Sequence, residues 1–185
     1  MTTEALNDGQ SRMQGAVEAL DRDLNGIRTG RANPALVDSI NVEYGGATYP
    51  VNQLAQVSVP DARMLVIQPW DPSSISAIEK SIQSSDLGIT PGNDGKLIRL
   101  PIPPLTEERR KDLVRSVRKR VEEGKVAVRN VRRDAQDKIR RMQKASEISE
   151  DELRRAQDQL QKHTDAAIES MDQASKRKEE EVLSV

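Results

Sequence analysis

The side chains with the clearest chemical potential are the twelve basic residues between Val114 and Lys144, in the stretch VRSVRKRVEEGKVAVRNVRRDAQDKIRRMQK. Residues 107–144 hold 15 Lys and Arg against 7 Asp and Glu, a local charge of +8, whereas the remaining residues carry −9 and the whole chain −1. Arginine presents a planar fork of donors that matches phosphate oxygens, and crowded like charges favour a bound anion. The stretch is therefore a candidate binding surface for a polyphosphate such as nucleic acid.

These basic residues are expected to lie on one flank of a long helix. Apolar residues from Leu113 to Met142 recur at helical spacing, which predicts a helix of about 38 residues, roughly 57 Å long. Eight basic side chains lie about 120° from that apolar stripe and form what we call the cationic flank: Lys111, Arg115, Arg118, Lys125, Arg129, Arg132, Arg133 and Arg140. The alternative is a solvated face whose cations pair with acids at helical spacing, namely Glu122, Glu123, Asp134 and Asp137.

The scarcity of aromatic rings narrows the kind of nucleic acid. Trp70, Tyr44 and Tyr49 are the only aromatic residues, too few for a platform that stacks single-stranded bases. No helix-turn-helix or zinc-finger spacing points to DNA. Contacts to the phosphates of folded RNA are the interpretation that remains.

The sequence offers little for catalysis. It has one His, no Cys and no Gly-x-Ser-x-Gly motif, and His163 falls on the apolar stripe of a predicted helix, where histidine more often packs than acts as a base. Carboxylates are abundant, so a paired-acid or magnesium site stays open, but no spacing singles one out. We expect no enzymatic activity, no metal and no cofactor.

The chain is expected to be cytoplasmic. No apolar run approaches the roughly 18 residues that span a bilayer, and the start MTTEALNDGQ lacks the order of a signal peptide. The absence of Cys is compatible with a reducing compartment.

Three amphipathic helices are predicted to form a bundle. The first carries apolar residues from Leu6 to Ile27 and is expected to end at Thr29–Gly30, the second begins at Thr106, and the third follows Ser149. None has an apolar face wide enough to be stable alone, so a three-helix bundle buries all three faces. A free coiled coil of two helices would leave the first stripe unpaired.

The segment between the first two helices is predicted to be a small, mainly β domain with one helix. The strands are expected in SINVEY, TYPVNQLAQVSV and ARMLVIQPW, with turns at Gly45–Gly46 and Pro60–Asp61. A short helix would carry Ile75, Ile78 and Ile82. A hairpin turn at Asn93–Gly95 is expected to join strands at residues 88–90 and 96–100.

The predicted organisation is discontinuous, with a bundle of residues 1–30 and 106–185 and an inserted β/α/β domain of residues 31–105. The chain leaves and re-enters the bundle through two connecting segments, residues 28–32 and 101–106, where a pivot would need few torsions to change. A rigid boundary is the alternative.

Four blocks of sequence strongly resemble bacterial ribosome recycling factors. They are IRTGRANPALV (27–37), QPWDPSSISAIEKSI (68–82), SDLGITPGNDGKLIRLPIPPLTEERR (85–110) and VRNVRRDA (128–135). The resemblance implies an α+β fold in which a long three-helix bundle and an inserted β/α/β domain form an L similar in outline to transfer RNA, joined by a two-stranded hinge. Tyr44–Gly45 departs from the family's commoner pair of aromatics.

The resemblance also implies a function. Such factors bind the post-termination ribosome and, with elongation factor G and the GTP that this partner hydrolyses, separate the subunits and release the messenger RNA. The inserted domain is expected to meet elongation factor G. The protein itself is expected to be a monomer that binds neither a membrane nor a small-molecule substrate.

Matching the motifs residue by residue assigns two sets of candidate positions. The residues expected to bind large-subunit ribosomal RNA are Arg110, Arg129, Arg132 and Arg133, and Arg28 and Arg31, which sit beside the hinge, are expected to join them. The residues expected to form the hinge are Thr29, Gly30, Pro103, Pro104 and Leu105. The competing hypothesis is a protein-binding helical scaffold whose arginines are merely solvated.

Overall fold

The computed structural model describes residues 2–184 and divides into two compact units. The first unit consists of two stretches of chain, the residues up to Arg28 and Glu108–Ser184, and the second unit comprises Thr29–Glu107. Across residues 2–184, no helix combines enough length with enough apolar character to cross a lipid bilayer.

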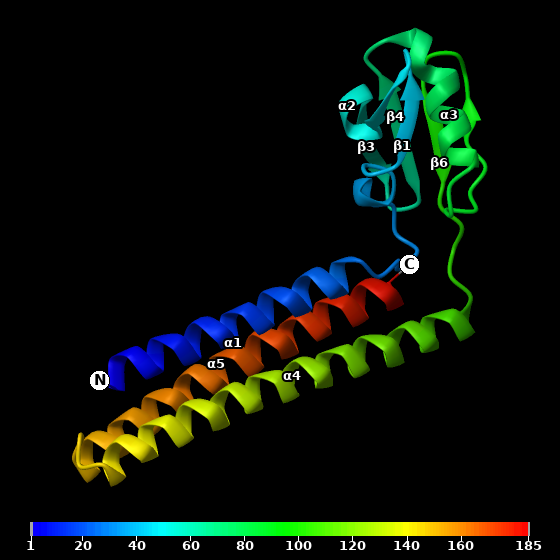
Figure 1. Ribbon diagram of the computed structural model, residues 1–185. Coiled ribbons are helices and arrows are strands. Elements are labelled where there is room, and N and C mark those ends of the chain that lie inside the picture. The colour runs from blue at the N-terminus through cyan, green and yellow to red at the C-terminus, as the bar shows by residue number, and fades with distance from the viewer. Residues whose placement is uncertain (1, 185) are drawn as a thin grey trace. The chain divides into compact units, whose positions relative to one another are not determined.

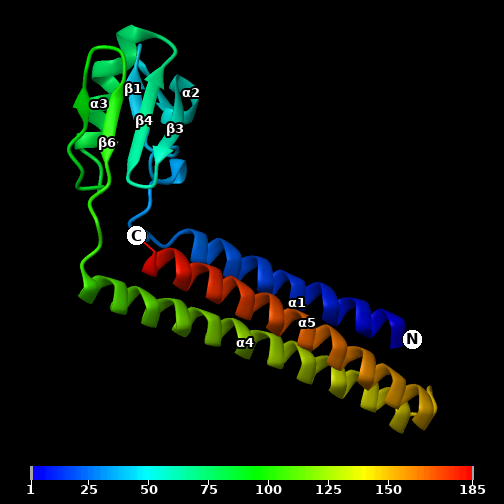
Figure 2. The same cartoon turned by 180° about the vertical axis from the view of Figure 1, so that it is seen from behind.

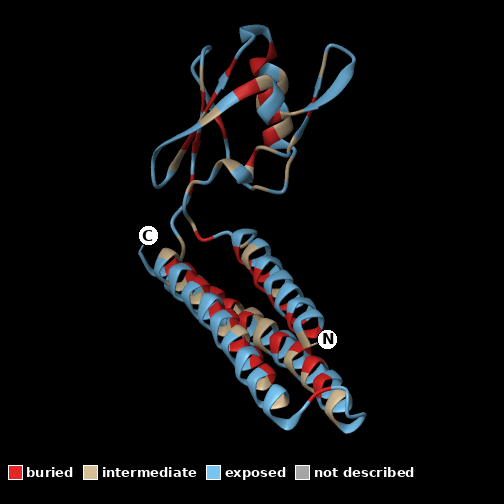
Figure 3. Cartoon of the chain, turned by 90° about the vertical axis from the view of Figure 1, so that its left-hand side faces the viewer, coloured by how far each residue is buried: buried red, intermediate tan, exposed pale blue. Residues whose placement is uncertain are grey.

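The first unit is the predicted bundle of three helices, α1 (Thr2–Asn25), α4 (Glu107–Lys144) and α5 (Glu150–Leu183). Figures 1 and 2 show α1 and α5 running in the same direction and α4 opposite to both. Apolar faces turn inward along the whole bundle (Figure 3). The expected α+β fold, a helical bundle with an inserted β/α/β domain, is confirmed.

Small residues allow the helices to pack closely. A Cβ added at Gly9 would lie 3.4 Å from Ala135 Cβ, and one added at Gly124 would lie 3.3 Å from Met171 Sδ. Interaxial distances depend on the side chains at the contact, so these positions let the backbones approach.

The turn between α4 and α5 is closed by backbone hydrogen bonds. Ser146, with φ of 59°, donates its N–H to Gln143 O at 3.0 Å, and Glu147 donates to Met142 O at 2.9 Å, the pattern of a Schellman motif. Ser149 then caps α5, because its Oγ accepts the N–H of Glu152 at 3.1 Å, as the sequence predicts. The two long helices are thereby fixed antiparallel.

One seam position differs from the prediction. Thr164 is buried and its Oγ1 donates to Leu160 O at 2.9 Å, whereas His163 is only half-buried. The difference is local, because Leu160 and Ala167 on either side are buried as the predicted stripe requires. Thr164 lies four residues after Leu160 and three before Ala167, and His163 lies three after and four before, so both positions suit helical spacing.

The second unit contains two antiparallel sheets and a helix. A two-stranded sheet pairs β1 (Asn41–Tyr44) with β2 (Ala47–Pro50) across the Gly45–Gly46 turn, where both glycines have positive φ. The other sheet has the order β3-β4-β6-β5, with β3 at Ala55–Asp61, β4 at Met64–Pro69, β5 at Gly92–Asn93 and β6 at Ile98–Pro101. The predicted helix is α3 (Ile75–Gln83), whose three isoleucines are buried in the core of this unit.

Several predicted boundaries are wrong. The helix α1 ends at Asn25 rather than at Thr29–Gly30, since the N–H groups of Gly26 and Ile27 make the last turn. The stretch TYPVNQLAQVSV is interrupted by α2 (Val51–Leu54), a single turn in which Val51 and Leu54 face the core at helical spacing.

Two further predictions, one of a strand and one of a turn, need correction. Residues 88–90 form no strand: Gly88 has φ of 66°, and pairing with β6 begins only at Gly92. Pro60 and Asp61 belong to β3, and the turn lies at Ala62–Arg63. Proline is tolerated there because β3 is an edge strand.

Candidate nucleic-acid interface and connecting segments

Three of the predicted RNA-binding arginines occupy little more than one turn of α4. Arg129 and Arg133 are exposed and Arg132 is half-buried, so their guanidinium groups lie at the bundle surface. The apolar neighbours Val128 and Val131 anchor this turn in the core. The long helix therefore presents the arginines on a rigid support.

The guanidinium groups of these residues are only partly satisfied. Arg129 Nη1 lies 3.1 Å from Glu122 Oε1, and Arg132 Nη1 donates to Gln161 Oε1 at 3.4 Å. The Nε of Arg132 is buried and has no hydrogen-bond partner within residues 2–184. Among the described residues, no carboxylate lies within ion-pair distance of Arg133 or Arg140. Donor capacity thus remains for an added acceptor.

The other half of the cationic flank is paired with acids. Arg118 Nε lies 2.8 Å from Glu179 of α5, Lys125 Nζ lies 2.5 Å from Asp172, and Arg115 pairs with Asp112. The alternative of a paired face therefore applies toward the start of α4, with most partners on α5 rather than at the four acids expected. Of those four, Glu122 pairs within α4 and Asp134 pairs with Arg12 of α1.

The remaining predicted arginines lie elsewhere. Arg110 is in the first turn of α4, half-buried, with a buried Nε that has no partner among the described residues. It precedes Arg129 by 19 residues, roughly 28 Å along a helix, and its spacing from Leu113 and Val117 places it on the apolar stripe. Arg28 and Arg31 are exposed and follow α1, Arg28 in the first unit and Arg31 in the second.

The predicted hinge residues differ in how they are packed. Thr29 is 3% exposed, and Gly30, with φ of 77°, is so close to Leu105 that an added Cβ would lie 2.7 Å from Leu105 Cγ. Pro103 and Pro104 are exposed. The two connecting segments therefore touch at Gly30 and Leu105.

Two backbone hydrogen bonds that were not predicted link these segments to the sheet. The N–H of Ala32 donates to Ala62 O at 2.7 Å, and the N–H of Ile102 donates to Arg63 O at 2.7 Å. Both acceptors belong to the turn between β3 and β4. Backbone contacts of this kind leave no residue pattern that a sequence reading could detect.

A network of polar side chains lies just before α3. The Tyr44 hydroxyl donates to Asp71 Oδ2 at 2.5 Å and lies 2.6 Å from Ser73 Oγ. Hydrogen bonds to the Asp71 carboxylate lower its pKa; the bond from the Tyr44 hydroxyl has the largest effect, and those from the Ser73 N–H and hydroxyl add to it. Next to this network Trp70 is 64% exposed, which is unusual for so large an apolar ring.

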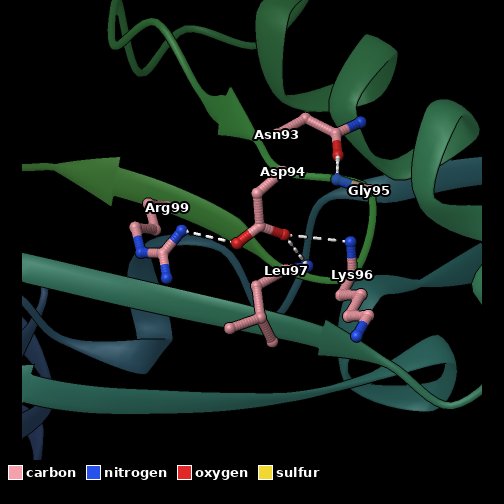
Figure 4. Close-up of polar contacts among 6 residues, drawn as sticks. All are labelled: Asn93, Asp94, Gly95, Lys96, Leu97 and Arg99. Carbon is pink, nitrogen blue, oxygen red and sulfur yellow. Dashed lines mark hydrogen bonds and ion pairs between the residues drawn. The ribbon is translucent and has the colours of Figure 1, made fainter.

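The turn between β5 and β6 is organised by two side chains (Figure 4). Asp94 Oδ1 accepts the N–H groups of Leu97 and Lys96 at 2.8 and 2.9 Å, and Oδ2 lies 2.7 Å from Arg99 Nη1. These bonds lower the pKa of Asp94 from 3.8 to about 2. Asn93 Oδ1 accepts the Gly95 N–H at 2.7 Å, which confirms the predicted turn.

Comparison with known proteins identifies the family. A family model described as ribosome recycling factor matches residues 20–183. The ribosome-recycling factor of Halalkalibacterium halodurans is 63% identical over 127 residues, 69% of this chain and 69% of that protein, and that of Shouchella clausii is 58% identical over the same shares.

Solved structures agree with this result. A solution structure of a ribosome recycling factor matches with a TM-score of 0.78 and 43% identity, over 100% of this chain and 98% of that one. Another matching structure, with 51% identity, a TM-score of 0.67 and 99% coverage of both chains, comes from models of the T. thermophilus ribosome recycling factor and the E. coli elongation factor G bound to the E. coli post-termination complex. The chain therefore belongs to the ribosome recycling factor family.

Proposed function

We propose that this protein binds the post-termination ribosome and, with elongation factor G, separates its subunits so that they can start a new round of translation. Family membership supports the recycling role, and the related factor placed with elongation factor G on the post-termination complex supports the partners. The protein has no catalytic step of its own, because the GTP is hydrolysed by elongation factor G. It acts as a monomer in the cytoplasm, without a cofactor.

The observation that carries the RNA contact is the incompletely satisfied group Arg129, Arg132 and Arg133. These side chains project from one rigid helix, and the acids that neutralise the start of the flank do not reach Arg133 or Arg140 among residues 2–184. Phosphate oxygens would supply the missing acceptors with a matching fork geometry. We assign these arginines to the phosphates of large-subunit ribosomal RNA.

Arg110, Arg28 and Arg31 are proposed as additional contacts rather than as members of the same group. Arg110 is about 28 Å from Arg129 along α4, so it would meet a different part of the RNA. Its buried Nε without a partner among the described residues supports an acceptor supplied from outside.

The two units would have different roles. The bundle anchors the protein on RNA, while elongation factor G acts on the second unit, where Trp70 offers an exposed ring of the kind that interfaces favour. Thr29, Gly30, Pro103, Pro104 and Leu105 would form the hinge about which the second unit moves.

Ribosome cosedimentation across a salt series tests the anchor. Arg132→Ala should weaken binding and reduce the slope of log affinity against log salt by roughly one unit, as expected for one lost phosphate contact. Arg12→Ala is the matched control, because Arg12 lies on α1 and pairs with Asp134. An unchanged slope for Arg132→Ala, or an equal loss for both variants, would refute the proposed contact.

A further inference from the structure

Two separate segments of the chain are attached to one short turn of the second unit. Ala62 O accepts the N–H of Ala32, just after the first connecting segment passes Gly30, and Arg63 O accepts the N–H of Ile102, where the second segment begins. Each bond is 2.7 Å long, and the two acceptors are consecutive in the chain. The turn therefore joins the ends of both segments.

The turn is itself held in shape. Asp61 Oδ1 accepts the N–H of Arg63 at 2.8 Å, and Asp61 pairs with Met64 across the base of the hairpin. An aspartate that bonds the backbone two residues on stabilises a tight turn. The Asp61 side chain thus fixes the direction of the carbonyls that receive the connecting segments.

The attached residues belong to the rigid part of the second unit. Ile102 is 8% exposed in the core, Ala32 packs against the same core, and β6 pairs Pro101 with Met64 directly beside the turn. Beyond Ile102, Pro103 and Pro104 have no N–H and cannot continue the ladder. The backbone ladder beside the turn therefore ends at Ile102.

We propose that the turn Asp61–Arg63 positions the pivot for recycling: by holding Ala32 and Ile102 side by side, it confines bending to residues 28–31 and 103–106. Asp61 is a positioning residue that acts through the two backbone carbonyls. This inference rests on the proposed function, in which elongation factor G moves the second unit about the hinge. Such a movement is transmitted only if the connecting segments are firmly attached to the second unit. Without the attachment, the segments would yield along their length.

Amide hydrogen exchange in the full-length protein tests the attachment. Asp61→Ala should accelerate exchange of the Ala32 and Ile102 amides about fivefold, as expected for one weakened hydrogen bond, while the amides of Leu65 and Ile67 keep the parent rate. Asp61→Asn should restore the parent rates, because its Oδ1 can still accept the Arg63 N–H. Asp86→Ala is the control, because Asp86 has no hydrogen bond or ion pair within the described chain.

Recycling assays test the role. Asp61→Ala should bind ribosomes with the parent affinity and salt slope, yet split them several-fold more slowly with elongation factor G, and Asp61→Asn should recover the parent splitting rate. Parent exchange rates at Ala32 and Ile102 in Asp61→Ala would overturn the attachment, as would acceleration that includes Leu65 and Ile67. Faster exchange with unchanged splitting would overturn the positioning role and leave the proposed function standing, whereas failure of the parent protein to split ribosomes would refute the function itself.

Discussion

Gly30 and Leu105 lie against each other where the two connecting segments meet, so that a Cβ added at Gly30 would be 2.7 Å from Leu105 Cγ. The φ of Gly30 is +77°, a conformation that side chains rarely adopt. Close approach and backbone conformation therefore both require glycine at this position, which is where the proposed hinge would bend.

Gly30→Ala should impair subunit splitting more than ribosome binding. The left-handed conformation costs a non-glycine residue roughly 1–2 kcal/mol, and the new methyl group would push Leu105 aside. The anchoring arginines on α4 are untouched. Splitting by stopped-flow light scattering and binding by cosedimentation should separate the two effects.

The double variant Gly30→Ala/Leu105→Ala provides the control. Truncating Leu105 removes the atom in the way, so the double variant should split ribosomes faster than Gly30→Ala alone, a coupling that a double-mutant cycle measures. Strictly additive losses would show that the contact is not the cause, and an equal loss of binding and splitting in Gly30→Ala would argue against a lever.

Glu122→Gln should tighten ribosome binding. In the free protein Glu122 Oε1 lies 3.1 Å from Arg129 Nη1 and competes with any phosphate for that guanidinium. Exposed ion pairs contribute about 0.2–1 kcal/mol, so the affinity should rise by up to about fivefold at low salt and less at high salt.

Glu123→Gln makes the same change of charge on the next residue of α4. Glu123 borders a groove between α1 and α4, away from Arg129. A gain of equal size in both variants would mean that overall charge, rather than release of Arg129, controls binding.

The long helices were predictable because their signal is repeated many times. The apolar residues of α4 mark one face from Leu113 to Ile139, and the observed helix, Glu107–Lys144, begins and ends where the sequence indicates. The same spacing could have separated Arg110 from Arg129, since Arg110 falls on the stripe of Leu113 and Val117. Matching by motif alone placed Arg110 in one set with Arg129, although the two lie far apart along α4.

Features that rest on a single residue or on backbone contacts were not predictable. The α2 turn is only Val51–Leu54, too short for periodicity to distinguish it from a strand. The attachment of Ala32 and Ile102 to the turn Asp61–Arg63 joins backbone groups remote in sequence, so no side-chain pattern encodes it. Thr164 and His163 both fit the helical spacing between Leu160 and Ala167, so periodicity alone did not decide which of the two is buried.

Gly15→Ala should stabilise the bundle. Gly15 is exposed in α1, and apart from the adjacent backbone of its own helix nothing lies within 4 Å of an added Cβ, so alanine gains helix propensity without a clash. The free energy of unfolding should rise by about 0.5–1 kcal/mol, measured by urea unfolding followed by circular dichroism. Gly9→Ala should gain less, because its Cβ would lie 3.4 Å from Ala135 Cβ. Equal gains at both positions would mean that α1 packs more loosely on its neighbours than the structure indicates.

Asp94 should make the stability of the second unit depend on pH in the acid range. Bonds from Leu97 N–H, Lys96 N–H and Arg99 lower its pKa from 3.8 to about 2, so the folded unit favours the carboxylate. A lowered folded pKa contributes stability that is fully present above the unfolded pKa and is lost as the pH falls through the folded value. Stability should therefore decline between about pH 4 and pH 2, and Asp94→Ala should flatten this part of the profile.

Thermal unfolding of the second unit, followed through NMR signals of β6 and α3, measures the pH effect. Asp86→Ala is the control, because it removes an exposed carboxylate of the same unit that makes no hydrogen bond within residues 2–184. This variant should show the same dependence of stability on pH as the parent. Since Asp94 Oδ1 holds the turn through two backbone N–H groups, Asp94→Asn should keep part of the stability at neutral pH while losing the acid dependence. An acid slope unchanged in Asp94→Ala would show that other carboxylates control the transition.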